Sequence, residues 1–249
     1  MRELDDYRDR YRGERCVIIG NGPSLREMDL SPLASEFTFG LNRAYLMFDE
    51  IGFRTSFLVV VNKYVVEQCG SEIVDAGVPT FVSWHARHSM PAGAAPTYLC
   101  TVRRPGFAHD VRNGLWAGAT VTYVALQLAY HMGFQEAVLI GVDHSFATTG
   151  TPNALVVSAG DDPNHFDPAY FGKGFRWQLP DLETSEIAYE TARRAFAAAG
   201  RRIVDATVGG KLHIFPKVSY AELFRTADGF AADLQHPRLL PGEAGPPRG

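Results

Sequence analysis

Six short apolar runs recur along the chain. Their residues are hydrophobic almost without a break, rather than alternately hydrophobic and polar. Continuous runs of this kind are typical of strands that are buried on both faces, as in a parallel sheet. The pattern predicts strands at residues 16–20, 37–42, 56–62, 79–84, 136–143 and 201–207.

Longer segments between several of these runs carry apolar residues at the spacing of amphipathic helices. They lie at residues 63–77, 118–134 and 182–200, and Gly133 and Gly200 supply stop signals for the last two. The charged residues 1–15 suit a short polar helix or an arm. Because strands and helices alternate, we expect an α/β fold with a Rossmann-like, doubly wound, mostly parallel sheet.

One long segment interrupts this alternation. Residues 146–180 are rich in Gly, Pro, Asp and aromatic residues. A connection of this length inside a compact domain is usually functional, and we expect a lid over an active site. The predicted organisation is a single Rossmann-like nucleotide-binding catalytic domain over residues 1–230, with the lid at about 146–180. The Pro- and Gly-rich residues 231–249 are expected to form a flexible tail.

Charge and composition narrow the class of protein. The net charge of -4 gives no electrostatic argument for binding nucleic acid. No apolar run reaches the roughly 18 to 20 residues that span a bilayer, and the charged N-terminus does not resemble a signal peptide. The three cysteines have no CxxC spacing, which argues against a disulfide framework or a zinc site. We therefore expect a cytoplasmic protein without a membrane span.

The stretch "GNGPSL" directly follows the first predicted strand and precedes a helix-like pattern. In open α/β sheets, ligands bind beyond the carboxyl ends of the strands. Gly20 and Gly22 allow close approach of the backbone, and the N-terminus of a following helix can face an anion. The stretch is neither GxGxxG nor a P-loop. It is a candidate nucleotide-binding loop, with an ordinary strand-to-helix turn as the alternative.

A second glycine-containing loop follows the last predicted strand, in "DATVGGKLHIF" at residues 205–215. Because it follows a strand of the same parallel sheet, we expect it at the same edge as the first loop. It is a candidate substrate loop, with a plain turn as the alternative.

Several stretches in one order resemble a known superfamily. They are "IIGNGPSL", "LNRAY", "VVN", "GATVTYVALQLAYHMGFQEAVLIGVDHS" and "PNHF". Over about residues 15–215 the chain resembles the bacterial sialyltransferases of glycosyltransferase family 42. It also resembles the broader group that holds the Maf flagellin-modification glycosyltransferases and the MptE-like 6-hydroxymethylpterin diphosphokinases.

The sialyltransferase resemblance implies a set of nucleotide-binding residues. Asn21 and Ser24 match the donor-nucleotide loop, within a site that also includes Gly20 and Gly22. The family's second and third asparagines, and its small pair at a helix start, fall on Asn42, Asn62, Ala119 and Thr120. An amide suits this work because it both donates and accepts hydrogen bonds. Asparagines at strand ends can equally cap turns.

The same resemblance implies the catalytic residues. His165 in "PNHF" matches the family's catalytic histidine, and Asp143 in "GVDHSF" matches its aspartate. In an inverting transfer, imidazole can take the proton from the attacking acceptor hydroxyl. His144 and His213 compete with His165 for this role. Asp143 has an alternative role in tying down the loop that follows it, and His165 has a non-catalytic alternative.

The chain departs from the family at the group that steadies the leaving phosphate. Of the family's two tyrosines, the first falls at Ser145, and the second has no counterpart in "ATTGTPN". The residues that could substitute are Tyr170, Lys173, Arg176 and His144. This departure puts the CMP-sialic acid donor itself in question.

The resulting expectation is a glycosyltransferase that needs no cofactor. Its donor would be a nucleotide-activated sugar, with a CMP-linked nonulosonic acid suspected, and its acceptor a glycan or small molecule. The alternative is an MptE-like diphosphokinase whose Mg²⁺ would be held by carboxylates among Asp143, Asp161, Asp162 and Asp181. A noncatalytic nucleotide-binding module is a third class, and the sequence leaves a homo-oligomer open.

Overall fold

The computed structural model describes residues 2–224. Seven strands form a central sheet in the order β5-β4-β3-β2-β1-β6-β9, and every neighbouring pair is parallel. The predicted tail at residues 231–249 lies outside the described residues. The strands are β1 (Arg15–Ile19), β2 (Phe37–Leu41), β3 (Phe57–Val60), β4 (Thr80–Ser83), β5 (Thr97–Leu99), β6 (Glu136–Ile140) and β9 (Arg202–Asp205).

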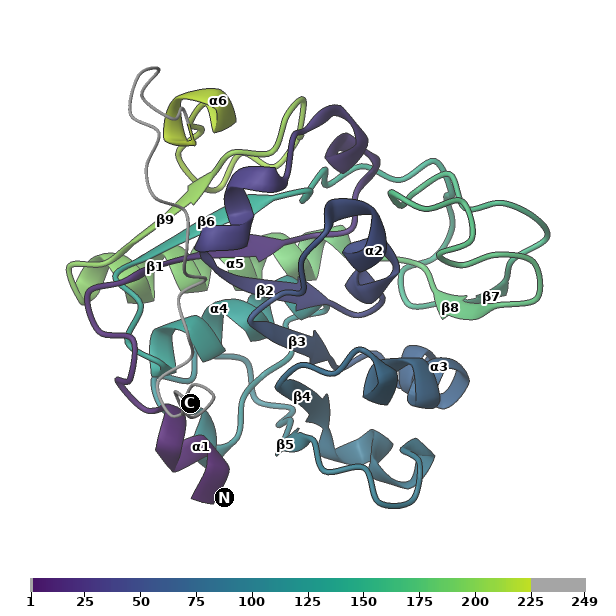
Figure 1. Ribbon diagram of the computed structural model, residues 1–249, viewed down its shortest axis with the longest axis horizontal. Coiled ribbons are helices and arrows are strands. Elements are labelled where there is room, and N and C mark those ends of the chain that lie inside the picture. The colour runs from purple at the N-terminus through teal and green to yellow at the C-terminus, as the bar shows by residue number, and fades with distance from the viewer. Residues whose placement is uncertain (1, 225–249) are drawn as a thin grey trace, which may run out of the picture.

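Helices cover both faces of this sheet (Figure 1). The α-helices are α1 (Arg2–Tyr7), α2 (Phe48–Ile51), α3 (Lys63–Asp75), α4 (Val121–His131), α5 (Leu182–Ala198) and α6 (Tyr220–Leu223). Short 3-10 helices are η1 (Pro23–Glu27), η2 (Ser31–Ser35), η3 (Ala44–Met47), η4 (Trp84–Ser89) and η5 (Val111–Asn113). The Rossmann-like, doubly wound fold predicted from the sequence is confirmed, and the described sheet is wholly parallel.

Alternate residues of β1 enter two separate hydrophobic cores. Cys16 and Ile18 pack in the core that contains α4 and α5. Val17 and Ile19 pack in the core that contains α3. All four side chains are fully buried. This explains the continuous apolar run, because a strand with helices on both faces has no side exposed to water.

The order of the strands reverses at β1. From β1 the chain builds β2, β3, β4 and β5 on one side, and β6 and β9 on the other. β1 and β6 are paired directly, with Ile19 opposite Ile140. Ligands of open α/β folds bind at such a reversal, beyond the carboxyl ends of the strands. The fold thus directs attention to the loops after Ile19 and Ile140.

One local expectation is wrong. The segment after the first glycine loop is the five-residue 3-10 helix η1, not an α-helix. The connection from β1 to β2 contains Pro23 and Pro32, each at the start of a 3-10 helix. Proline disfavours the α conformation in the residue before it, which breaks this stretch into short turns. A single 3-10 turn does not supply the anion-binding helix N-terminus expected there.

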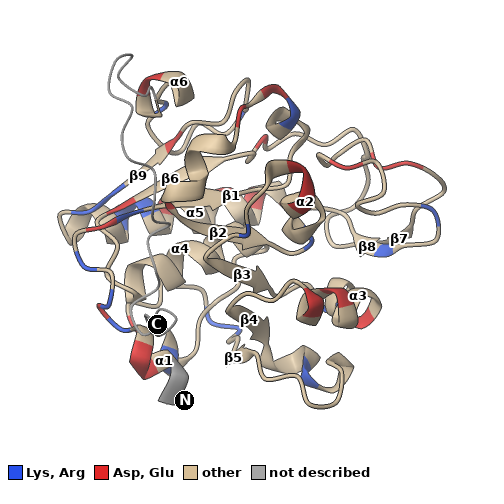
Figure 2. Ribbon diagram, in the orientation of Figure 1, with Lys and Arg blue, Asp and Glu red and all other residues tan. Residues whose placement is uncertain are grey.

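Residues 146–180 lie beside the carboxyl ends of the strands and carry a two-stranded antiparallel sheet of β7 (Leu155–Val157) and β8 (Arg176–Gln178) (Figure 1). Lys and Arg occur in short, separate segments interleaved with Asp and Glu along the described chain (Figure 2). No helix in residues 2–224 is both long enough and apolar enough to cross a membrane.

Candidate active site

The loops after β1 and β6 meet backbone to backbone at the reversal of the sheet. The amide of Gly22 donates to the carbonyl of Gly141 at 2.9 Å. A Cβ atom added to Gly20 would lie 2.2 Å from the Gly141 oxygen, and one added to Gly22 would lie 1.8 Å from Oδ2 of Asp143. Neither position has room for a side chain. The two glycines are therefore needed for the close approach of these loops.

Asp143 fastens the first loop to the second. Its Oδ1 accepts from the Ser24 amide at 3.1 Å, and its Oδ2 accepts from the Ser24 hydroxyl at 2.7 Å. The loop after β9 also packs here, because Lys211 donates its amide to the Asp143 carbonyl and the Thr207 hydroxyl accepts from the Val142 amide. Asp143 thus ties down the β1 loop as well as carrying its own loop.

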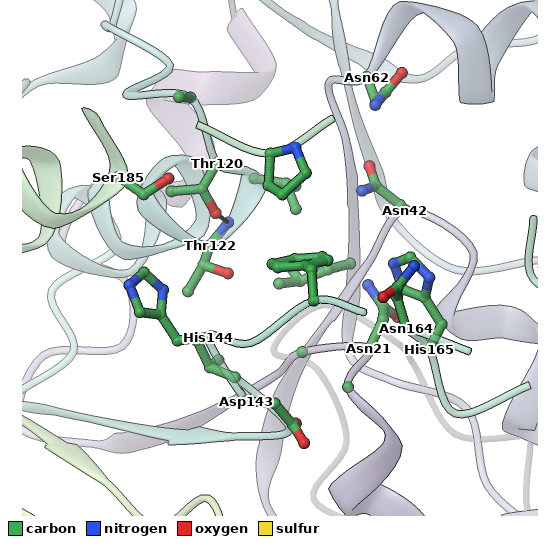
Figure 3. A pocket seen from close by; sticks show the side chains of 18 of the residues that line it. Asn21, Asn42, Asn62, Thr120, Thr122, Asp143, His144, Asn164, His165 and Ser185 are labelled. Carbon is green, nitrogen blue, oxygen red and sulfur yellow. Dashed lines mark hydrogen bonds between the residues drawn. The ribbon is translucent and has the colours of Figure 1, made fainter. Parts of the chain in front are cut away.

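Three asparagines follow three neighbouring strands, as Figure 3 shows for Asn21, Asn42 and Asn62. The side-chain oxygen Oδ1 of Asn62 caps α3 by accepting from the amides of Tyr64 at 2.9 Å and Val65 at 3.4 Å. The side-chain carbonyl oxygens of Asn21 and Asn42 are buried and have no hydrogen-bond partner within the described chain. An unpaired buried acceptor is costly, so these two oxygens suit a ligand that brings donors.

A cavity of ≈ 450 Å³ lies over these strand ends. The start of α4, the N-terminal part of α5 and the lid segment line its other sides. Ser24, Lys173 and Arg176 do not lie among its lining residues. The candidate substrate loop at residues 205–215, with the competing histidine His213, does not line it either. Of the residues predicted for the nucleotide, the base and the phosphate, the following line it: Gly20, Asn21, Gly22, Asn42, Asn62, Ala119, Thr120, Asp143, His144, Ser145, His165 and Tyr170.

Backbone strain is concentrated around this cavity. Five non-glycine residues of the described chain have a positive φ in the left-handed region. Four of the five line the cavity, and they are Asn42, Ala119, His144 and Asn153. Residues held in this conformation cost on the order of 1 kcal/mol or more each, and such residues cluster at binding and catalytic sites.

His165 belongs to a hydrogen-bonded pair in the lid. Its Nδ1 lies 2.6 Å from Oδ2 of Asp162, whose side chain is 2% exposed. The imidazole also stacks on the ring of Tyr170, with centroids 4.0 Å apart. The Asp162 carboxylate and the Tyr170 ring together fix the orientation of the imidazole. Nε2 is left as the ring nitrogen available to a ligand.

Asp162 is held in its charged form. Burial raises the pKa of the Asp162 carboxyl group, but the hydrogen bond to His165 and its electrostatic interaction lower that pKa. The backbone amides of Asn164 and Phe171 also donate to this carboxylate, at 2.8 and 3.1 Å. The net effect is a pKa of Asp162 below its usual value. A buried carboxylate that stays ionised is suited to stabilising a protonated histidine beside it.

Of the remaining residues proposed for the phosphate, Tyr170 and Ser145 line the cavity, whereas Lys173 and Arg176 do not. Tyr170 is completely buried, and its hydroxyl accepts from the Arg43 amide at 3.4 Å. Lys173 is exposed. Arg176 lies 3.4 Å from a Glu67 carboxylate oxygen on α3. Ser145 lines the cavity directly after the β6 loop.

A second histidine–carboxylate pair lies across the cavity from His165 (Figure 3). Nε2 of His144 is 2.8 Å from Oε1 of Glu186, in the first turns of α5. The His144 side chain is 8% exposed, whereas that of Glu186 is 53% exposed. Nearby, the Thr120 hydroxyl caps α4 and lies 3.2 Å from the Tyr189 hydroxyl. This side of the cavity therefore combines an imidazole with two hydroxyl groups.

The lid is joined to the β1 loop. The Phe166 amide donates to the Asn21 carbonyl at 2.8 Å, and Arg26 donates to the carbonyls of His165 and Phe166. Asn164, which also lines the cavity, accepts from the Ala147 amide at 2.7 Å.

Sequence reasoning missed Glu186, Asn164 and the pairing of Asp162 with His165. Only the last had a local signal, an aspartate three residues before the histidine.

The acids proposed for a magnesium ion do not form a cluster. Asp143 bonds Ser24, Asp162 bonds His165, and Asp181 caps α5 by accepting from the Thr184 amide. Asp161 is exposed. Residues 2–224 contain no group of three or more His, Cys, Asp or Glu side chains that could hold a metal ion. The four proposed acids therefore do not converge on one position in the described chain.

Comparisons with known proteins give a structural neighbour and a family for the chain. The structure resembles that of a Maf glycosyltransferase from Magnetospirillum magneticum AMB-1, with a TM-score of 0.52 and 14% sequence identity. The match covers 87% of this chain but 37% of that one, so the chain spans little more than a third of that protein's length. No curated protein matches. A family model matches residues 1–149, and by this match the chain belongs to the 6-hydroxymethylpterin diphosphokinase MptE-like family.

Proposed function

We propose that the protein is a glycosyltransferase that moves a sugar from a nucleotide-activated donor to a hydroxyl group. One observation carries the proposal most strongly. The Asp162–His165 pair faces a cavity at the reversal of the parallel sheet, next to the β1 loop to which the lid is hydrogen-bonded. This arrangement supports a general base at His165, close to the strand ends where such folds bind nucleotides.

His165 acts as the base in this proposal. Its Nδ1 is engaged by Asp162, so Nε2 receives the proton of the acceptor hydroxyl as the hydroxyl oxygen attacks the sugar carbon. The ionised Asp162 stabilises the imidazolium that results. For a transfer with inversion, the attacking hydroxyl and the leaving phosphate lie on opposite sides of the sugar carbon, and the base acts on the hydroxyl.

The strand-end asparagines form the nucleotide subsite. The buried carbonyl oxygens of Asn21 and Asn42 accept from donor groups of the nucleotide. Asn62 caps α3 with its oxygen, which leaves its amide nitrogen to donate to a ligand. Lys63 is the one Lys or Arg among the described residues that line the cavity. So little fixed positive charge suits a donor with a single phosphate, such as a CMP-linked nonulosonic acid.

A second candidate follows from the family match over residues 1–149. In an MptE-like diphosphokinase, the hydroxyl of 6-hydroxymethylpterin would receive a diphosphate from ATP, and AMP would leave. Such transfer depends on Mg²⁺ to bridge and neutralise the phosphates. Because the acids proposed for Mg²⁺ do not converge in the described chain, we put the diphosphokinase second.

One experiment separates the two candidates. The protein is incubated with CMP-, UDP- and GDP-sugars, and separately with ATP and 6-hydroxymethylpterin, each in EDTA and in Mg²⁺. With the nucleotide-sugars, water takes the place of the acceptor hydroxyl and receives the sugar. The released nucleotide is quantified by chromatography. We expect nucleotide release from one nucleotide-sugar that is unchanged by EDTA. AMP release from ATP that needs both the pterin and Mg²⁺ would overturn the glycosyltransferase and establish the diphosphokinase.

A further inference from the structure

The cavity has a second imidazole whose role the proposed base does not explain. His144 and His165 lie on opposite sides of the cavity (Figure 3). His144 is held in the left-handed conformation, at φ 53°, directly after the β6 loop. Its side chain is 8% exposed and lines the cavity. A strained, nearly buried histidine that faces a cavity is a candidate for contact with a ligand.

Glu186 determines which ring nitrogen of His144 can meet that ligand. Nε2 of His144 bonds Oε1 of Glu186 at 2.8 Å, which leaves Nδ1 as the ring nitrogen not engaged by Glu186. When the imidazole is protonated, Nδ1 becomes a charged donor while Nε2 stays bonded to the carboxylate. Glu186 is half exposed, so its effect is orientation and local charge rather than a strong buried ion pair.

The position on the far side from the base is where negative charge develops during sugar transfer. The bond between the sugar carbon and the bridging phosphate oxygen breaks, and its electron pair stays on that oxygen. The acceptor oxygen forms the new bond to the carbon, and its proton goes to His165. A charged donor aimed at the departing phosphate stabilises the transition state.

The other described candidates for this donor are less suited to it. Lys63 lines the cavity, but its Nζ is ion-paired with Glu67, 3.3 Å from Oε1. Lys173 and Arg176 do not line the cavity, and Arg176 lies beside Glu67 on α3. The Tyr170 hydroxyl is buried and bonded to the Arg43 amide. Ser145 lines the cavity but is neutral. Among the four substitutes named from the sequence, His144 alone both lines the cavity and presents an unengaged polar atom that can carry a positive charge.

We propose that His144, positioned by Glu186, binds the phosphate of the leaving nucleotide. This inference rests on the proposed glycosyltransferase function and adds a residue to it. His144 is the group that contacts the phosphate, and Glu186 acts through His144. The two histidine–carboxylate pairs then divide the reaction, with one receiving the acceptor proton and the other holding the departing phosphate.

The test measures the contribution of the phosphate to affinity. Calorimetry gives the dissociation constants of the nucleosides cytidine, uridine, guanosine and adenosine and of their 5′-monophosphates. The dissociation constant of a nucleoside divided by that of its monophosphate gives the contribution of the phosphate to affinity, and we call this quotient the phosphate ratio. In His144→Gln we expect this ratio to fall about 10- to 100-fold, as for the loss of one charged hydrogen bond, with nucleoside affinity unchanged.

Variants of α5 test the positioning role. Glu186→Gln keeps an acceptor for Nε2, whereas Glu186→Ala removes it, so we expect the phosphate ratio to fall less in the first than in the second. Glu183→Gln is the matched control, because Glu183 is exposed on the same helix and does not line the cavity. A merely structural role for Glu186 would lower nucleoside and nucleotide affinity together and leave the ratio unchanged.

The outcomes distinguish this inference from the proposed function. If a monophosphate binds and its ratio is unchanged in both His144→Gln and Glu186→Ala, His144 does not hold the phosphate, but the glycosyltransferase stands. If the wild-type protein binds none of the nucleotides, both proposals fail. The exposed Glu186 variants keep the test valid should His144→Gln not fold.

Discussion

Replacing Asp162 by asparagine separates the two functions of this carboxylate with the smallest change of shape. In the structure, Oδ2 accepts from Nδ1 of His165 and from the Phe171 amide, while Oδ1 accepts from the Asn164 amide. Asparagine has one carbonyl oxygen and one amide nitrogen. In either orientation, at least one of the three donors faces an NH₂ group and loses its acceptor.

The expected loss of stability follows from that count. A buried donor left without an acceptor costs about 1–3 kcal/mol. If the NH₂ group faces His165, Nδ1 must accept, and the proton moves to Nε2, where it blocks the base. If it faces Asn164, His165 keeps its orientation but loses the charge that stabilises the imidazolium. Either way turnover should fall by about 10²-fold or more.

Two quantities are measured for Asp162→Asn: the free energy of unfolding in urea and the turnover with the best nucleotide-sugar. Asp161→Asn is the control for both. Asp161 is the exposed neighbour, and its variant should match the wild type in both.

The difference in stability should also depend on pH. Because the pKa of Asp162 is lowered in the folded state, its contribution is complete above the unfolded value of about 3.9 and is lost as pH falls through the folded value. Equal turnover in Asp162→Asn and the wild type would refute the role given to this pair.

Three further predictions concern the strand-end loops. Gly20→Ala places a Cβ against the Gly141 carbonyl and should lower stability by about 1–3 kcal/mol in urea unfolding, whereas Gly160→Ala, which meets nothing within 4 Å, should not. Asn21→Ala should weaken nucleotide binding in calorimetry while the melting temperature is retained, and unchanged affinity would remove this loop from the site. Asn62→Asp keeps the α3 cap but loses the NH₂ group, so nucleotide affinity should fall. Stability should be retained, whereas Asn62→Ala should lose about 1 kcal/mol of it with the cap. Equal affinity in Asn62→Asp and the wild type would limit Asn62 to capping.

Much of the fold was predictable because its signals are local. The buried run at β1 is apolar throughout, and α5 has clear helical spacing that ends beside Gly200. β5 was missed because it is a three-residue edge strand, Thr97–Leu99, whose pairing with β4 sequence periodicity cannot show. The segment at η1 was expected to begin an α-helix. Pro23 and Pro32 break this stretch into short 3-10 helices instead.

The site was predictable in its parts but not in its pairings. The glycines of the β1 loop stood out, yet their reason, the close approach of the β6 loop, is a contact between residues more than a hundred positions apart. Glu186 could not be chosen from the sequence, because its pairing with His144 exists only once α5 packs beside the end of β6. Ser24 was expected at the nucleotide, and the structure places it against Asp143.

The central claim is that His165 is the base of a sugar transfer in this cavity. Its most direct test is His165→Ala, assayed for turnover and for nucleotide affinity on the same preparation. We predict that kcat falls by about 10²- to 10⁴-fold while nucleotide affinity changes little, because the base acts on the acceptor. The rise of the wild-type rate with pH should also disappear. Near-normal turnover in His165→Ala would contradict the claim.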